Sequence, residues 1–77
     1  MPKLPRLSGR ELLKLLAQFG FVFIRQKGSH IIVKKKTTEG EIGTVIPDHK
    51  ELAEGTLKGI LKQPQISLEK FLEKYHN

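Results

Sequence analysis

Apolar side chains recur at helical spacing near the start of the chain. The stripe consists of leucines and one phenylalanine: Leu12, Leu13, Leu15, Leu16 and Phe19. Ser8 and Glu11 precede most of it with the spacing of a capping box, in which each side chain accepts a backbone hydrogen bond from the other residue. Gly20 follows it and can adopt the left-handed conformation that ends a helix. The pattern therefore predicts a helix that Ser8 opens and Gly20 ends.

From residue 21 onward, the pattern changes to short runs of β-branched and aromatic residues. These runs predict strands at residues 21–26, 30–36 and 42–46. Residues 27–29 and 37–41 between them contain the glycines expected of turns. Strands joined by connections this short pair with antiparallel neighbours, so we expect a three-stranded meander.

Side chains of the second predicted strand alternate between the two faces of the sheet. One face carries Ile31, Val33 and Lys35, and we expect it to cover the helices. The opposite face carries a histidine, an isoleucine and two lysines: His30, Ile32, Lys34 and Lys36. We expect this second face to be open to solvent and to a ligand.

The last third of the chain is polar after Pro47 and then helical. The polar residues 48–55 predict a loop, in which residues 51–54 can form one helical turn. Thr56 is the predicted N-cap of a short helix that Pro64 ends near residue 62. Ser67 is the predicted N-cap of a last helix whose apolar residues fall at helical spacing: Leu68, Phe71, Leu72 and Tyr75. Together the patterns predict a single α+β domain over residues 1–77, with one or two C-terminal helices packed with the first against one face of the sheet.

Composition narrows the possible chemistry of this small domain. The 77 residues include no cysteine, which excludes zinc fingers, iron–sulfur sites and cysteine nucleophiles. No apolar run approaches the length of a membrane span, and the amino terminus has no signal-peptide core. We therefore expect an intracellular, cytoplasmic protein that does not bind membranes.

The positive charge lies in the first half of the chain. Overall, 14 Lys and Arg residues against 8 Asp and Glu give a formal charge of +6. Residues 1–36 hold nine basic residues and one acid, a charge of +8, whereas the remaining residues carry −2. Such a basic half favours a nucleic acid as the partner, because Lys and Arg release counterions from phosphates. The alternative is that the lysines serve solubility alone.

His30 is the candidate for proton-transfer chemistry. It follows Gly28 and Ser29 and shares a strand face with Lys34 and Lys36, so an imidazole that titrates near neutrality would lie among cations. The acids are scattered and no glycine-rich phosphate loop is present, so we expect neither a metal site nor a nucleotide cofactor. His30 as an ordinary surface residue, and the lysines as a charged strand end, remain alternatives. His49 fits a role in loop hydrogen bonding, and His76 lies near the terminus.

Several segments, in this order along the chain, resemble the HicA toxin family. They are Gly28-Ser29-His30, residues 46–49, Gly55-Thr56-Leu57, residues 60–63 and residues 66–72. The resemblance implies a toxin of a type II toxin–antitoxin system that cleaves or binds mRNA and that a HicB-type antitoxin holds inactive. It also implies a fold similar to double-stranded-RNA-binding domains. The family's active-site histidine falls on His30 and the preceding glycine on Gly28.

The residues and the resemblance together favour a metal-independent mRNA endoribonuclease without a cofactor. His30 would be its general base or acid, with the partner group unassigned. Gly28 and Ser29 would let the RNA backbone approach, and Lys27, Lys34 and Lys36 would bind phosphates. One alternative is a non-catalytic module that reads the shape of A-form RNA. Another is a small subunit whose positive face binds an acidic protein.

Overall fold

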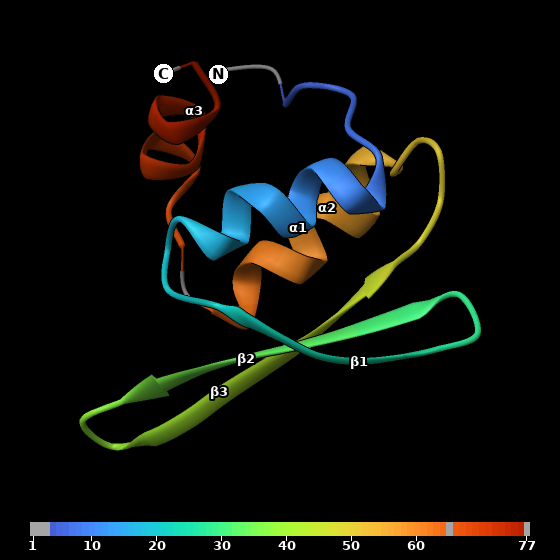
Figure 1. Cartoon of the computed structure of the whole chain (residues 1–77). Helices are drawn as coiled ribbons and strands as arrows, with labels where there is room; N and C mark the ends of the chain where they lie inside the picture. Colours follow the sequence, from blue (N-terminus) through green and yellow to red (C-terminus); the bar gives the residue numbers. More distant parts are fainter. Residues whose placement is uncertain (1–3, 65, 77) are drawn as a thin grey trace.

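The chain folds as a three-stranded sheet covered on one side by three helices. The computed structural model describes residues 4–64 and 66–76. In chain order the elements are α1 (Gly9–Ala17), β1 (Val22–Lys27), β2 (His30–Thr37), β3 (Gly40–Pro47), α2 (Glu54–Lys62) and α3 (Leu68–His76). All three helices lie on the same side of the sheet, as Figure 1 shows. The predicted α+β architecture, with two C-terminal helices, is confirmed.

The sheet is an antiparallel meander in the order β1-β2-β3, as predicted. Two-residue connections join the strands, because β1 ends at Lys27 where β2 begins at His30, and Thr37 pairs with Gly40 across the second turn. The strands differ from the predicted ranges by one or two residues at their ends. Strand β1 also contains a bulge between Phe23 and Arg25, which the sequence pattern did not predict.

The hydrophobic core lies between the sheet and the helices. Ile31 and Val33 of β2 are buried against it, while Lys34 and Lys36 on the opposite face are exposed. The predicted division of β2 into an inner and an outer face is therefore confirmed. The helices contribute further large buried side chains, among them Leu12 and Leu16 from α1, Leu57 and Leu61 from α2, and Phe71 from α3.

Helix α1 begins and ends through the expected residues. The Ser8 hydroxyl accepts a hydrogen bond from the Glu11 amide at 3.0 Å, and the Glu11 carboxylate accepts one from the Ser8 amide at 2.9 Å. The helix itself ends at Ala17, and Gly20 then adopts a φ of 96°. The Phe21 amide returns to the Leu16 carbonyl at 3.2 Å, which closes the end of the helix.

Helix α3 also has its predicted cap, because the Ser67 hydroxyl accepts from the Lys70 amide at 3.2 Å. The start of α2 corrects the sequence interpretation. Its N-cap position is Ala53, which makes no side-chain cap, so Thr56 lies inside the first turn and is not the cap. The helical turn that the sequence allowed at residues 51–54 does not form. Instead, the buried Leu52 donates its amide to the Leu7 carbonyl at 2.7 Å. Ala53 after it has an extended backbone, and the helix begins at Glu54.

Candidate functional site

His30 lies at the end of the first hairpin, on the side of the sheet away from the helices. It pairs with Lys27 of β1 and with Pro47 of β3. Because directly opposed residues of antiparallel strands share a face, the side chains of Lys27 and His30 stand next to each other. Both are exposed. The structure thus brings together two of the residues that the sequence singled out.

Gly28 and Ser29 form the turn between these two strands. Gly28 has a φ of 59°, a conformation that favours glycine. A Cβ atom at this position would meet nothing within 4 Å, so the turn is open on the outside. The backbone at the turn is therefore accessible to a large ligand that approaches the Lys27 and His30 side chains.

Lys34 and Lys36 share the face of His30 but lie farther along β2. At about 3.3 Å per residue they stand roughly 13 and 20 Å from His30 along the strand. Lys34 pairs with Val22 and Gly43, and Lys36 pairs with Glu41. The two lysines therefore belong to the same surface as His30 without surrounding its imidazole.

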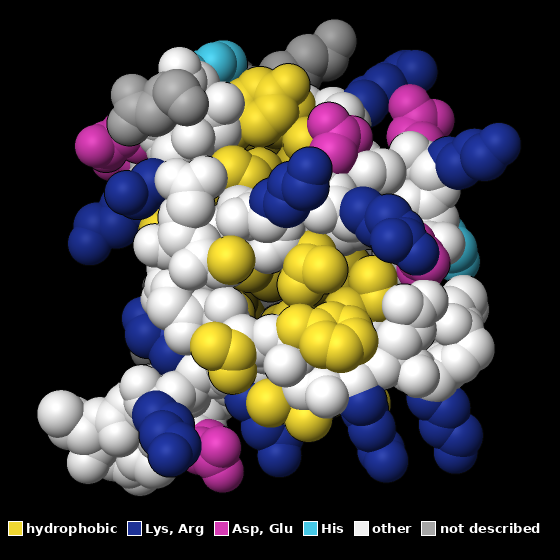
Figure 2. Space-filling view, in the orientation of Figure 1, with side chains coloured by type: hydrophobic (Ala, Val, Ile, Leu, Met, Phe, Trp, Pro, Cys, Tyr) yellow, Lys and Arg dark blue, Asp and Glu magenta, His cyan; other side chains and the backbone are white. Residues whose placement is uncertain are grey.

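We call the side of the sheet that carries His30, Ile32, Lys34 and Lys36 the outer face. Its cations are Arg25, Lys27, Lys34 and Lys36. Figure 2 shows Lys and Arg side chains that project from this side, below the sheet. Sequence reasoning missed Arg25, because the predicted strand ends at residue 26 and leaves Lys27 in the turn. In the structure Lys27 belongs to β1, so Arg25, two residues before it, shares its face.

The outer face is apolar as well as basic. Val22, Ile24 and Val45 are 58%, 46% and 47% exposed. Val22 and Ile24 line a shallow hollow of about 380 Å³ together with Lys34, Lys36 and Glu41. The surface thus suits a ligand with both anionic and apolar parts.

On the other side of the sheet, a polar network holds the turn from behind. The Gln26 amide nitrogen Nε2 donates to the Gly28 carbonyl and to the Asp48 carboxylate, each at 3.0 Å. The Asp48 backbone amide donates to the Ser29 carbonyl at 2.7 Å. Arg10 of α1 pairs with the same carboxylate, its Nε lying 3.3 Å from Oδ1. Sequence reasoning did not single out Gln26 or Asp48, because partners so far apart in the chain leave no periodic signal.

The network favours the ionised form of Asp48. The hydrogen bond from Gln26, followed by the hydrogen bond and charge of Arg10, lowers the pKa of this carboxyl below its ordinary value of 3.8. Its oxygens point to Gln26 and Arg10, whereas His30 belongs to the outer face. Within residues 4–64 and 66–76, the His30 ring makes no hydrogen bond or ion pair. Asp48 is therefore not placed as the proton-transfer partner of His30.

The two other histidines lie outside this surface. The His49 backbone carbonyl accepts a hydrogen bond from the Gly9 amide at 2.9 Å. This bond does not involve the imidazole, whose predicted role in loop hydrogen bonding stays a prediction. His76 is exposed at the end of α3 and lies edge-on to the ring of Tyr75.

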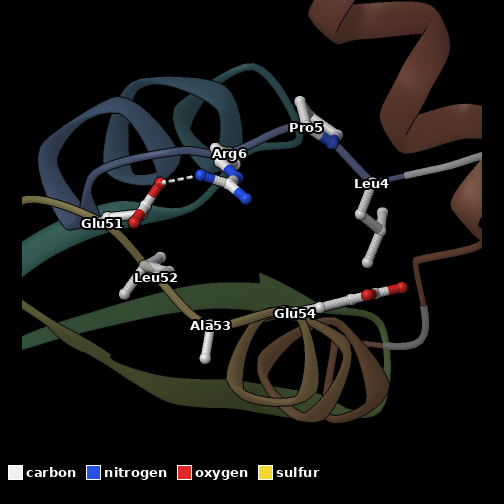
Figure 3. A pocket seen from close by; sticks show the side chains of 7 residues that line it. All are labelled: Leu4, Pro5, Arg6, Glu51, Leu52, Ala53 and Glu54. Carbon is white, nitrogen blue, oxygen red and sulfur yellow. Dashed lines mark ion pairs between the residues drawn. The ribbon is translucent and has the colours of Figure 1, made fainter.

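A second hollow, of about 530 Å³, lies between residues 4–6 and the start of α2 (Figure 3). Across it, Arg6 and Glu51 form an ion pair at 3.5 Å, and both side chains are largely exposed. Neither the hairpin nor the outer face contributes to its lining. It offers no histidine and is separate from the basic surface.

Among the described residues, no three His, Asp or Glu side chains gather as a metal site would require. Over the same residues, no helix has the length and apolar character to cross a membrane.

Comparison with known protein families identifies the chain. The model described as the HicA toxin of bacterial toxin–antitoxin systems matches residues 9–66. The chain belongs to the HicA toxin family. The matched segment contains the whole sheet, the hairpin turn and the network behind it. Comparisons with curated proteins and with solved structures gave no significant match. As a HicA toxin, the protein is the toxin of a toxin–antitoxin pair.

Proposed function

We propose that this HicA toxin is a metal-independent endoribonuclease that cleaves mRNA and uses His30 as its catalytic residue. The observation that carries the proposal is the exposed His30 beside Lys27, at the open end of a basic sheet face. An imidazole has one ring nitrogen that can accept a proton and one that can donate it, so this side chain suits general acid–base catalysis.

The proposed reaction follows from the chemistry of RNA. His30 takes the proton of a ribose 2′-hydroxyl, whose oxygen then forms a bond to the adjacent phosphorus. The bond between phosphorus and the 5′-oxygen breaks, and that oxygen receives a proton from the imidazolium or from water. Lys27 stabilises the negative charge that builds up on the phosphorane. The products are a 2′,3′-cyclic phosphate and a 5′-hydroxyl.

The rest of the outer face holds the RNA in this proposal. Lys34 and Lys36 bind phosphates along β2, and Arg25 adds a cation between them and Lys27. Gly28 and Ser29 allow close approach of the RNA backbone because the turn is open.

The same face is also the proposed contact for a HicB-type antitoxin. Exposed Val22, Ile24 and Val45 among the cations fit a protein whose acidic groups surround an apolar centre. A partner bound there would cover Lys34 and the approach to His30, and it would thereby silence the toxin.

Replacing His30 tests the proposal directly. Purified protein is incubated with a labelled single-stranded RNA in EDTA, and we expect cleavage. His30→Ala should lower kcat by at least about a hundredfold because the proton-transfer group is gone, while RNA affinity changes little. Growth arrest on induced expression should be lost in parallel.

His76→Ala is the matched control, because it removes an exposed histidine from α3 and should cleave like the wild type. Cleavage that depends on a divalent metal, or full activity of His30→Ala, would contradict the assignment. RNA binding without cleavage by the wild type would favour the non-catalytic RNA-binding module.

A further inference from the structure

Three segments that are distant in the sequence meet behind the hairpin turn. They are the start of α1, the end of β1 with its turn, and the loop after β3. Gly9 at the start of α1 is packed so closely that a Cβ atom there would overlap the Pro47 carbonyl oxygen. The turn is thus held against the body of the protein, in contrast to the second turn, whose side-chain hydrogen bonds stay within residues 37–40.

Gln26 is the centre of this arrangement. It pairs with Ile31, whose side chain is buried on the inner face, so Gln26 reaches the turn from the side opposite His30. Its amide group has two protons, and both are used: one on the Gly28 carbonyl and one on the Asp48 carboxylate. A side chain without these donors could not join the two acceptors.

Asp48 holds the hairpin turn from the loop after β3. Its carboxylate accepts from Gln26 and pairs with Arg10, and its backbone amide bonds to the Ser29 carbonyl. Both carbonyls of the turn, those of Gly28 and Ser29, are therefore held by the pair Gln26 and Asp48. His30 is the next residue along the chain.

We propose that Gln26 and Asp48 are positioning residues, which fix the Gly28–Ser29 turn and thereby the backbone from which the His30 imidazole projects on the outer face. This inference rests on the proposed function for its catalytic consequence. A small displacement of a catalytic group lowers the rate steeply, whereas Lys34 and Lys36, which bind phosphates in the proposed function, lie farther along β2 and away from the turn. Loss of the network should therefore affect kcat and leave KM nearly unchanged.

The chemistry of Gln26 allows a diagnostic pair of variants. Gln26→Ala removes both hydrogen bonds. Gln26→Glu keeps the size but turns an oxygen toward two acceptors, one of them the charged Asp48, so it should repel both. If Gln26 only filled space, glutamate would be the milder change. If it positions the turn, glutamate should be as harmful as alanine or more so.

The experiment measures turn order and catalysis separately on the full chain. Hydrogen exchange followed by NMR reports on the Asp48 amide, which is bonded to the Ser29 carbonyl. In Gln26→Ala we expect this amide to exchange several-fold faster. With a labelled single-stranded RNA in EDTA, kcat should fall on the order of ten- to a hundredfold at similar KM. Arg6→Ala, which breaks the exposed pair with Glu51, is the control and should change neither quantity.

Each outcome decides a separate point. Unchanged exchange of the Asp48 amide in both Gln26 variants would overturn the inference, whether or not RNA is cut. Faster exchange with unaltered kcat would overturn the catalytic role of the network. If the wild type leaves RNA intact, the proposed function fails and the catalytic part of the inference fails with it, while exchange still decides whether Gln26 holds the turn.

Discussion

At the scale of single residues, His30 and Asp48 lie close in the fold but have different surroundings. His30 projects into solvent from the outer face, next to Lys27. The Asp48 carboxylate is held on the other side by Gln26 and Arg10. An exposed imidazole is free to meet a substrate, whereas a carboxylate with two donors serves structure. The candidate catalytic residue and the carboxylate that supports its turn therefore lie on opposite sides of the sheet.

The lowered pKa of Asp48 predicts a specific pH dependence of stability. Because the folded state favours the ionised form, Asp48 stabilises the protein fully above pH 3.8, the ordinary value for this carboxyl. This contribution is lost as the pH falls through the lower pKa of the folded state. In urea unfolding, the stability advantage of the wild type over Asp48→Asn should therefore shrink below about pH 4.

Glu39→Gln is the control for this measurement, since Glu39 forms no ion pair among the described residues and lies exposed in the second turn. Its difference from the wild type should stay nearly constant over the same pH range. A stability gap for Asp48→Asn that grows as the pH falls would contradict the argument.

At the scale of elements, the helices differ in how the free backbone amides of their first turns are capped. Helix α1 begins with a complete capping box, α3 with the Ser67 hydroxyl, and α2 with no side-chain cap at all. Helix α2 begins where it does because Leu52 is bonded to the Leu7 carbonyl before it. Local sequence signals therefore set α1 and α3, and packing sets the start of α2.

This difference predicts opposite results for two similar substitutions. Ser8→Ala should lower the free energy of unfolding by about 1 kcal/mol, because the Glu11 amide at the start of α1 loses its acceptor. Thr56→Ala should cost nothing or slightly stabilise the protein, since alanine is the better helix former inside a helix. Urea unfolding of both variants checks this, and a larger loss for Thr56→Ala would show that Thr56 does cap α2.

At the scale of the whole molecule, the fold separates an apolar inner face from a basic outer face. The helices cover Ile31, Val33 and Ile46, and the outer face keeps its lysines and arginine in solvent. Four basic residues of the first half of the chain thus lie on one surface: Arg25, Lys27, Lys34 and Lys36. In the proposed function this surface binds RNA, and binding through cations and phosphates depends on salt.

RNA binding by the outer face should therefore respond to salt in a predictable way. Replacing both Lys34 and Lys36 by alanine should weaken binding and reduce the slope of log K against log salt by about 0.7 for each lost phosphate contact. His30→Ala is the background, so that cleavage does not interfere. Lys58→Ala, on α2 and paired with Glu54, is the control and should leave the slope unchanged. An equal effect of the control would indicate non-specific attraction by net charge.

Much of this protein is determined by local sequence. The helical stripe before Gly20, the alternation along β2 and the short turns led to the meander, its two faces and the exposure of His30. Such features depend on periodicity and on turn residues, which act over a few positions. The turn at Gly28 and Ser29 could be predicted for the same reason.

Only the tertiary structure decided how the segments combine. The bulge at Ile24 places Val22 on the outer face opposite Lys34, where simple alternation from Lys27 would have placed it inside. The pairing of Lys27 with His30 and the junction of Arg10, Gln26 and Asp48 depend on strand register and on long-range packing. These features depend on contacts between residues far apart in the chain, which no local sequence pattern indicates.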